Sequence, residues 1–151
     1  MRTLSLFSGI GGLDLGLERA GFEIVAAVEI EPYPQAVLAE RFPDTKIFDD
    51  VREVTGATVR SLGGVDAIVG GFPCQDVSAA GAGAGLDGER SGLWFEMLRI
   101  IREVEPLVVV AENVPALRAR GSDRVLEGLH RQGYAGGAFV VGARDVIGPH
   151  R

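Results

Sequence analysis

Three side chains with useful chemistry lie at the ends of apolar runs. Cys74 is the only cysteine of the chain, and it follows the apolar run at 65–72 after one proline. Glu112 and Asn113 fall near the end of a second apolar run, at 107–114. A thiolate is a strong nucleophile, and a carboxyl group whose pKa is raised by burial can donate a proton to a ring nitrogen. The pattern indicates addition of a nucleophile to an aromatic ring.

Each of these residues also has a purely structural interpretation. An isolated free cysteine is most often a small buried hydrophobic residue, and Asn113 has the residue type of a helix cap beside a surface glutamate. We prefer the chemical interpretation because both groups follow neighbouring strands of the expected sheet. Cys74, Glu112 and Asn113 then converge on one cleft.

A glycine-rich turn near the start of the chain indicates a nucleotide-like ligand. Gly9, Gly11 and Gly12 follow the apolar run at 3–7, and glycine allows a ligand to approach the backbone closely. Glu29 ends the next apolar run, 20 residues after Gly9, in the position from which a carboxylate binds ribose hydroxyls in nucleotide-binding folds. The alternative interpretation is a tight turn and a solvated glutamate.

Asp14 helps to distinguish between adenosine cofactors. It replaces the third small residue of the G-x-G-x-x-G pattern that is typical of dinucleotide-binding turns. A carboxylate repels a pyrophosphate, whereas S-adenosylmethionine (SAM) has no phosphate and carries a positive sulfonium. The turn therefore favours SAM, and an NAD(P)-binding oxidoreductase module is the alternative.

Composition and charge narrow the class of protein. The 151 residues are enough for one domain with a core, and 46% hydrophobic with 24% charged residues is ordinary for a globular protein. The formal net charge of −6 does not indicate a nucleic-acid surface. Apolar stretches are too short for a membrane span, and one cysteine cannot form an internal disulfide, so we expect a cytoplasmic protein with no membrane partner.

Short apolar runs alternate with amphipathic stretches along the chain. The expected strands are 3–7, 23–29, 46–51, 65–72, 107–114 and 137–144, and the expected helices are 13–20, 32–42, 92–104 and 122–133. Strands that are apolar throughout and alternate with helices predict a doubly wound α/β fold, whose mostly parallel sheet is covered on both faces. Ligands bind at the carboxyl ends of such strands, where all the residues above fall.

Three motifs together resemble those of the C5-cytosine DNA methyltransferases. The stretch "FSGIGGLDLGLERAGF" is similar to the first SAM-binding motif of that family, "GGFPCQDVS" to its catalytic loop, and "ENV" to its cytosine-binding motif. The run from "GERSG" to "ENV" resembles the segment that joins the last two motifs in the family. The resemblance covers essentially all 151 residues and implies the Rossmann-like fold of SAM-dependent methyltransferases.

The resemblance implies a mechanism. Cys74 attacks C6 of a cytosine flipped out of double-stranded DNA, and Glu112 holds N3 and the exocyclic amine. The activated C5 then takes the methyl group of SAM, without a metal. Gln75 and Asn113 complete the catalytic set, with Asn113 fixing the loop at 73–74.

The resemblance also implies how the cofactor is bound. Phe7 stacks on the adenine, Glu29 binds the ribose, and Asp50 contacts the adenine amine. Pro73 and Leu93 line the methionine side. The full set of implied cofactor-binding residues is Phe7, Ser8, Gly9, Gly11, Gly12, Glu29, Ile30, Asp50, Val51, Pro73 and Leu93.

The family has parts that residues 1–151 do not resemble, namely its target-recognition domain and its last motifs. Residues 1–151 then form the SAM-binding and catalytic part, and we expect a second polypeptide to supply the rest and to be needed for activity. The alternative is an inactive truncated fragment that retains weak binding of SAM or of a partner. We also expect the strand at 137–144 either to pair directly with 107–114, to fray, or to receive a strand from a partner.

Overall fold

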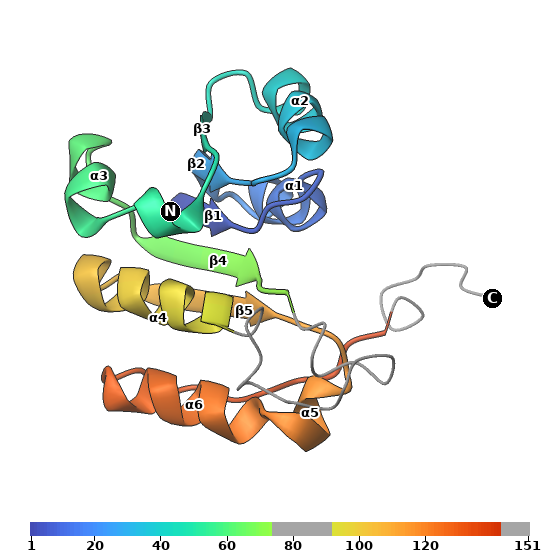
Figure 1. Ribbon diagram of the computed structural model, residues 1–151, viewed down its shortest axis with the longest axis vertical. Coiled ribbons are helices and arrows are strands. Elements are labelled where there is room, and N and C mark those ends of the chain that lie inside the picture. The colour runs from blue at the N-terminus through green and yellow to red at the C-terminus, as the bar shows by residue number, and fades with distance from the viewer. Residues whose placement is uncertain (74–91, 143–151) are drawn as a thin grey trace.

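The computed structural model describes residues 1–73 and 92–142. Five strands form one sheet in the order β3-β2-β1-β4-β5, and every pairing between them is parallel (Figure 1). The strands are β1 (Arg2–Leu6), β2 (Glu23–Val28), β3 (Lys46–Phe48), β4 (Ala67–Gly71) and β5 (Val108–Glu112). The helices are α1 (Gly12–Arg19), α2 (Pro32–Arg41), α3 (Gly56–Ser61), α4 (Gly92–Val104), α5 (Leu117–Arg120) and α6 (Ser122–Arg131), with a 3₁₀ turn η1 (Val51–Glu53) after β3.

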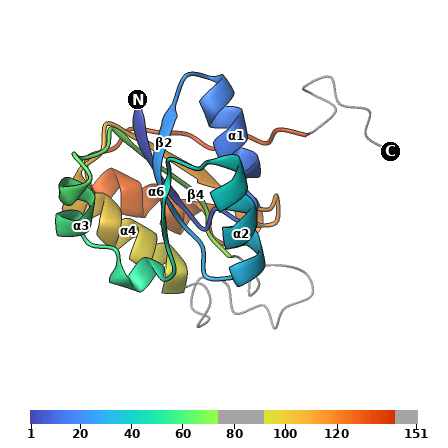
Figure 2. The ribbon, with the colours of Figure 1, turned by 90° about the horizontal axis from the view of Figure 1, so that it is seen from above.

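Helices cover both faces of the sheet, which confirms the predicted doubly wound α/β fold. Helices α1 and α2 lie on one face, and α3, α4 and α6 lie on the other (Figure 2). The helical spacing of Trp94, Met97 and Ile101 places these three residues on one side of α4, where they are buried in the main core. Burying each side chain of this size contributes about 1.5–3 kcal/mol. No helix in the described part of the chain is long and apolar enough to cross a membrane.

The segment after β3 differs from the prediction. The expected strand at 46–51 ends at Phe48, because the Asp50 side chain accepts a hydrogen bond from the Arg52 N–H at 2.9 Å and caps η1 instead. Helix α3 was not expected, although the sequence carries a signal for it. Thr55 and Thr58 each bond the other's backbone N–H and form a capping box at its start.

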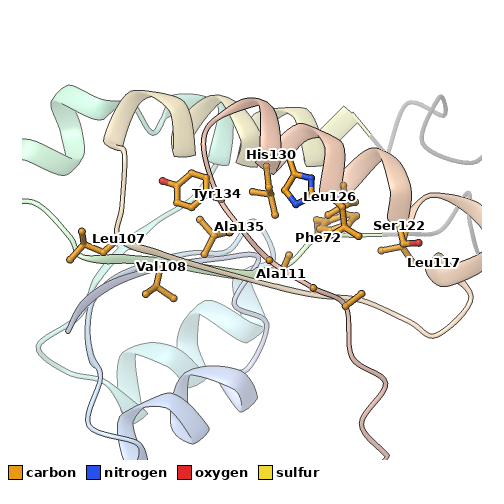
Figure 3. Close-up of a pocket in the computed structure, with 16 residues that line it drawn as sticks. Phe72, Leu107, Val108, Ala111, Leu117, Ser122, Leu126, His130, Tyr134 and Ala135 are labelled. Atoms are coloured by element: carbon orange, nitrogen blue, oxygen red, sulfur yellow. The ribbon is translucent and has the colours of Figure 1, made fainter.

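The prediction of a sixth strand is wrong over residues 137–142, and residues 143–144 lie outside the described part. Residues 137–142 pair with no strand, so β5 is an edge of the sheet as described. Of the three outcomes expected for this segment, direct pairing with β5 does not occur over 137–142, and the unpaired state agrees with fraying. Residues of β5, α6 and 134–138 instead line an apolar cavity of about 320 Å³ (Figure 3). Phe139 is therefore 88% exposed.

Candidate active site

A cavity of about 220 Å³ opens at the carboxyl ends of the central strands. Seven of the predicted cofactor-binding residues line it: Phe7, Glu29, Ile30, Asp50, Val51, Pro73 and Leu93. Four further lining residues were not predicted: Val28, Asp49, Arg52 and Gly71. The rule that ligands bind beyond strand ends could have found Asp49 and Arg52, which follow β3 closely.

Glu29 joins the glycine turn to the end of β2. Its Oε2 accepts a hydrogen bond from the Gly9 N–H at 2.8 Å, and its Oε1 accepts one from the Glu31 N–H at 2.9 Å. Glu29 is only 9% exposed, so these bonds fix the carboxylate at the cavity wall. Each carboxylate oxygen has a further lone pair, which leaves Glu29 able to accept a hydroxyl of a ligand.

The remaining predicted residues of the turn shape it and do not line the cavity. Gly11 has a φ of 80°, and a Cβ there would lie 2.6 Å from the ring of Phe42, so only glycine fits. Ser8 donates a hydrogen bond to the Ser5 side chain at 2.8 Å. Gly9 supplies its N–H to the carboxylate at the end of β2, and Gly12 begins α1.

Phe7 has the backbone conformation that the turn imposes. Its φ of 57° lies in the left-handed region. Residues other than glycine rarely adopt this backbone conformation, which costs roughly 1–3 kcal/mol. The Phe7 ring nevertheless packs against the main core and lines the cavity. Strain of this kind gathers at functional sites, because the surrounding structure must stabilise it.

Asp14 lies away from the cavity wall. It is 1% exposed, and neither of its carboxylate oxygens has a hydrogen-bond partner. Burial raises the pKa of the Asp14 carboxyl, an effect that the nearby Ser5 hydroxyl partly offsets. Asp14 therefore does not face a ligand in the cavity, and other acidic residues must decide which cofactor fits.

Acidic side chains surround the cavity on the side of β2 and β3. Asp50 accepts the Arg52 N–H and forms an ion pair with the Arg52 guanidinium at 3.3 Å. Asp49 accepts a hydrogen bond at 3.2 Å from Gln35, which also donates to the Glu29 carbonyl at 2.6 Å. With Glu29, these residues place three carboxylates and one guanidinium at the cavity wall. A ligand that carries phosphates would be repelled here.

Glu112 stands beside this cavity. It is the register partner of Gly71, which lines the cavity, and a Cβ on Gly71 would lie 2.8 Å from the Glu112 Oε2. The Glu112 residue is exposed at the strand end. Cys74 and Gln75 lie outside the described residues, and Pro73, directly before them, lines the cavity.

Asn113 links the end of β5 to the chain just before Cys74. The Asn113 Nδ2 donates a hydrogen bond to the Phe72 carbonyl at 2.8 Å, and its Oδ1 accepts one from the Val114 N–H at 2.8 Å. The Phe72 ring in turn lies 5.2 Å from that of Trp94. Glu112 thus lies beside the last residue of β4, and Asn113 bonds the residue that follows β4.

The sequence profile described as C-5 cytosine-specific DNA methylase matches residues 1–150. The chain belongs to this family. The family confirms the resemblance on which the site residues were predicted. The description of the family names cytosine in DNA as the target of methylation. The apolar cavity between β5 and α6 contains none of the predicted site residues (Figure 3).

Three similar proteins of known name are each longer than this chain. Type II methyltransferase M2.BsuMI of Bacillus subtilis is 38% identical over all of the chain, which covers 40% of that protein. Type II methyltransferase M.NgoPII of Neisseria gonorrhoeae is 39% identical over 85% of the chain, which covers 38% of it. A DNMT2 structure from Spodoptera frugiperda superposes with a TM-score of 0.68 at 25% identity, over 87% of this chain and 41% of that one. The chain spans about two fifths of their length.

Proposed function

We propose that this chain forms the SAM-binding and catalytic part of a DNA (cytosine-5) methyltransferase. The observation that carries the proposal is the single cavity lined by Phe7, Glu29, Asp50, Pro73 and Leu93, with Glu112 on the neighbouring strand end. The family membership supports the reaction class, and the position of the cavity beside Gly71, the register partner of Glu112, supports it as the place for the cofactor.

The residues of the cavity fit SAM by their chemistry. Phe7, Ile30 and Val51 offer apolar surface for the adenine ring, and Glu29 offers lone pairs for the ribose hydroxyls. Asp50 is the proposed acceptor for the adenine amine, with Pro73 and Leu93 on the methionine side. The excess of carboxylates suits a cationic sulfonium and disfavours the pyrophosphate of NAD(P). When bound, SAM supplies the methyl group.

The catalytic roles follow from the chemistry of each side chain. The Cys74 thiolate adds to C6 of a cytosine that has left the duplex. Glu112 holds N3 and the exocyclic amine and stabilises the charge that develops on the ring. Asn113 bonds the Phe72 carbonyl and thereby fixes the approach to Cys74, with Gln75 beside the nucleophile. The addition makes C5 nucleophilic, and C5 takes the methyl group. C5 then loses its proton to water, and the electron pair of that C–H bond restores the ring double bond as the bond between sulfur and C6 breaks and frees the thiolate.

Turnover is proposed to need protein beyond these 151 residues. The chain covers 40% of M2.BsuMI, and its formal net charge of −6 is poorly suited to binding a polyanion. We propose that a second polypeptide supplies target recognition and the rest of the cofactor pocket. The same two observations favour one alternative, an inactive chain that binds SAM or a partner without turnover.

The test is transfer of a labelled methyl group from SAM to duplex DNA. The chain is assayed alone and together with the polypeptide encoded directly downstream of it. We expect methylated cytosine only in the mixture, and none when Cys74→Ser replaces the thiol, because a hydroxyl is a far weaker nucleophile at neutral pH. Undiminished transfer by the Cys74→Ser mixture would refute the assigned nucleophile. Binding of SAM without transfer in any mixture would favour the alternative.

A further inference from the structure

One wall of the cofactor cavity is a short turn and not a strand end. Asp50 and Val51 line the cavity from η1 and the residue before it. The turn is only three residues long, and besides the Asp50 cap two backbone–backbone hydrogen bonds hold it: Glu53 N–H to the Asp50 carbonyl at 3.1 Å, and Val54 N–H to the Val51 carbonyl at 3.3 Å. A turn of this kind does not fix its own position relative to a neighbouring helix.

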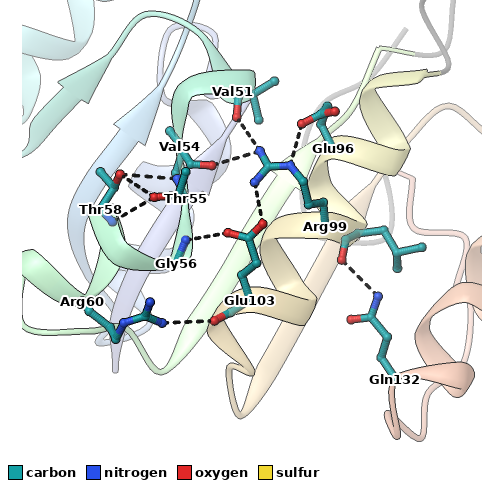
Figure 4. A network of polar contacts seen from close by, with 11 residues as sticks. Val51, Val54, Thr55, Gly56, Thr58, Arg60, Glu96, Arg99, Glu103 and Gln132 are labelled. Atoms are coloured by element: carbon teal, nitrogen blue, oxygen red, sulfur yellow. Dashed lines mark hydrogen bonds and ion pairs between the residues drawn. The ribbon is translucent and has the colours of Figure 1, made fainter.

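Arg99 on α4 reaches across to this turn. Its Nη2 donates hydrogen bonds to the Val54 carbonyl at 2.9 Å and to the Val51 carbonyl at 3.3 Å (Figure 4). Val51 is the first residue of η1, and Val54 is the residue directly after its end. Because Leu93 lines the same cavity from the start of α4, one side chain joins two of the cavity walls.

Two carboxylates hold the guanidinium in place. Arg99 Nε bonds Glu96 at 2.9 Å, and Arg99 Nη1 bonds Glu103 at 2.9 Å. The other Glu103 oxygen accepts the Gly56 N–H at 2.7 Å, so the network continues to the start of α3. The Gly56 N–H, and then Arg99, hold the pKa of Glu103 below its usual range. Burial alone would lower the pKa of Arg99, but Glu103 and Glu96 outweigh it and raise that pKa.

We infer that Arg99 is a positioning residue for the cofactor cavity: it fixes η1 against α4 so that Asp50 and Val51 meet the ligand. This inference rests on the proposed function, because it takes the cavity to be the SAM site. A purely structural role for Arg99 predicts instead that its loss lowers the unfolding temperature and leaves the Kd for SAM unchanged. The Val51 and Val54 side chains are buried in the core, so the turn stays packed without the guanidinium and loses only its exact placement.

The experiment uses the full chain with Arg99→Met, which keeps an unbranched side chain of similar length and removes every N–H donor. Arg99→Lys keeps the charge beside Glu96 and Glu103 but not the planar donor group. Arg131→Met is the matched control, because Arg131 forms an exposed ion pair with Glu127 on α6, away from this cavity. Calorimetry measures the Kd for SAM, thermal unfolding measures stability, and amide exchange is followed at Glu53 and Val54.

For Arg99→Met we expect a Kd raised about tenfold and faster exchange at Glu53 and Val54. Arg99→Lys should raise the Kd and the exchange rate by less than Arg99→Met does, and Arg131→Met should change neither quantity. A lowered unfolding temperature with unchanged Kd and unchanged exchange would overturn the inference. If Arg99→Met does not fold, the same comparison between Arg99→Lys and the wild-type chain decides. If the wild-type chain binds no SAM, the proposed function fails, and exchange in the turn still tests whether Arg99 positions it.

Discussion

Gly71 and Glu112 face each other across the β4–β5 pairing, so closely that a Cβ on Gly71 would lie 2.8 Å from the Glu112 Oε2. The atom in the way is the end of a flexible side chain. We therefore expect Gly71→Ala to displace the carboxylate at little cost in stability. In the complemented enzyme, methyl transfer should fall by about tenfold or more, on the scale of a lost transition-state contact, while the unfolding temperature changes little.

Gly70→Ala provides the contrast for this prediction. A Cβ on Gly70 would lie 2.7 Å from the Leu6 carbonyl, which is backbone inside the sheet and cannot move aside cheaply. That variant should lose stability, measured by urea unfolding, by the 1–3 kcal/mol that is typical of overpacking. Equal stability losses in the two variants would contradict the placement of Glu112 described above.

Asn113 should affect catalysis more than cofactor binding. Asn113→Asp keeps an oxygen for the Val114 N–H but cannot donate to the Phe72 carbonyl when it is ionised. We expect a loss of about 1 kcal/mol in stability and a lower kcat, because the chain leading to Cys74 is less well fixed. The Kd for SAM should stay nearly constant. A raised Kd with an unchanged kcat would show that this bond serves the cofactor instead.

Glu29 should matter for both the turn and the cofactor. In Glu29→Gln, one side-chain oxygen becomes an NH₂ group and faces a backbone N–H, either that of Gly9 or that of Glu31. Loss of such a charge-assisted bond costs about 1.5–3 kcal/mol, so SAM affinity measured by calorimetry should fall by at least tenfold. Glu31→Gln, at an exposed residue two positions on, is the control and should bind SAM like the wild type.

Asp14 should make the fold more stable in mild acid than at neutral pH. Burial raises the pKa of this carboxyl above its ordinary value of 3.8, so the unfolded chain ionises first as the pH rises. The stability that Asp14 contributes is present below the unfolded pKa and is lost as the pH rises through the folded one. Asp14→Asn should therefore stabilise the chain at pH 7 by on the order of 1 kcal/mol, and this gain should shrink toward pH 4.

Thermal unfolding of Asp14→Asn at several pH values checks this. Asp44→Asn serves as the control, because Asp44 is an exposed acid in the connection between α2 and β3. If Asp14→Asn raises the free energy of unfolding by the same amount at pH 4 and at pH 7, the substitution acts through packing and not through the charge.

The sequence by itself determined the fold class, the family and the position of most elements. Apolar runs such as 65–72 are buried on both faces of the sheet, so their pattern is set by local composition and survives in the structure as β4. Motifs near strand ends could also be placed, because parallel strands bring their carboxyl ends to one edge. Hence seven predicted cofactor residues share one cavity.

Tertiary structure alone decided the features that depend on contacts between distant segments. Residues 137–142 have the composition of a strand, but a strand needs a neighbour with free backbone groups in reach, and none pairs with them. The hydrogen bonds from Arg99 to the Val51 and Val54 carbonyls join residues that are 48 and 45 positions apart in the sequence. The burial of Asp14 likewise depends on which face of α1 packs against the sheet, and the residue type alone does not indicate it. Local patterns fix what each segment can become, whereas packing fixes which groups meet.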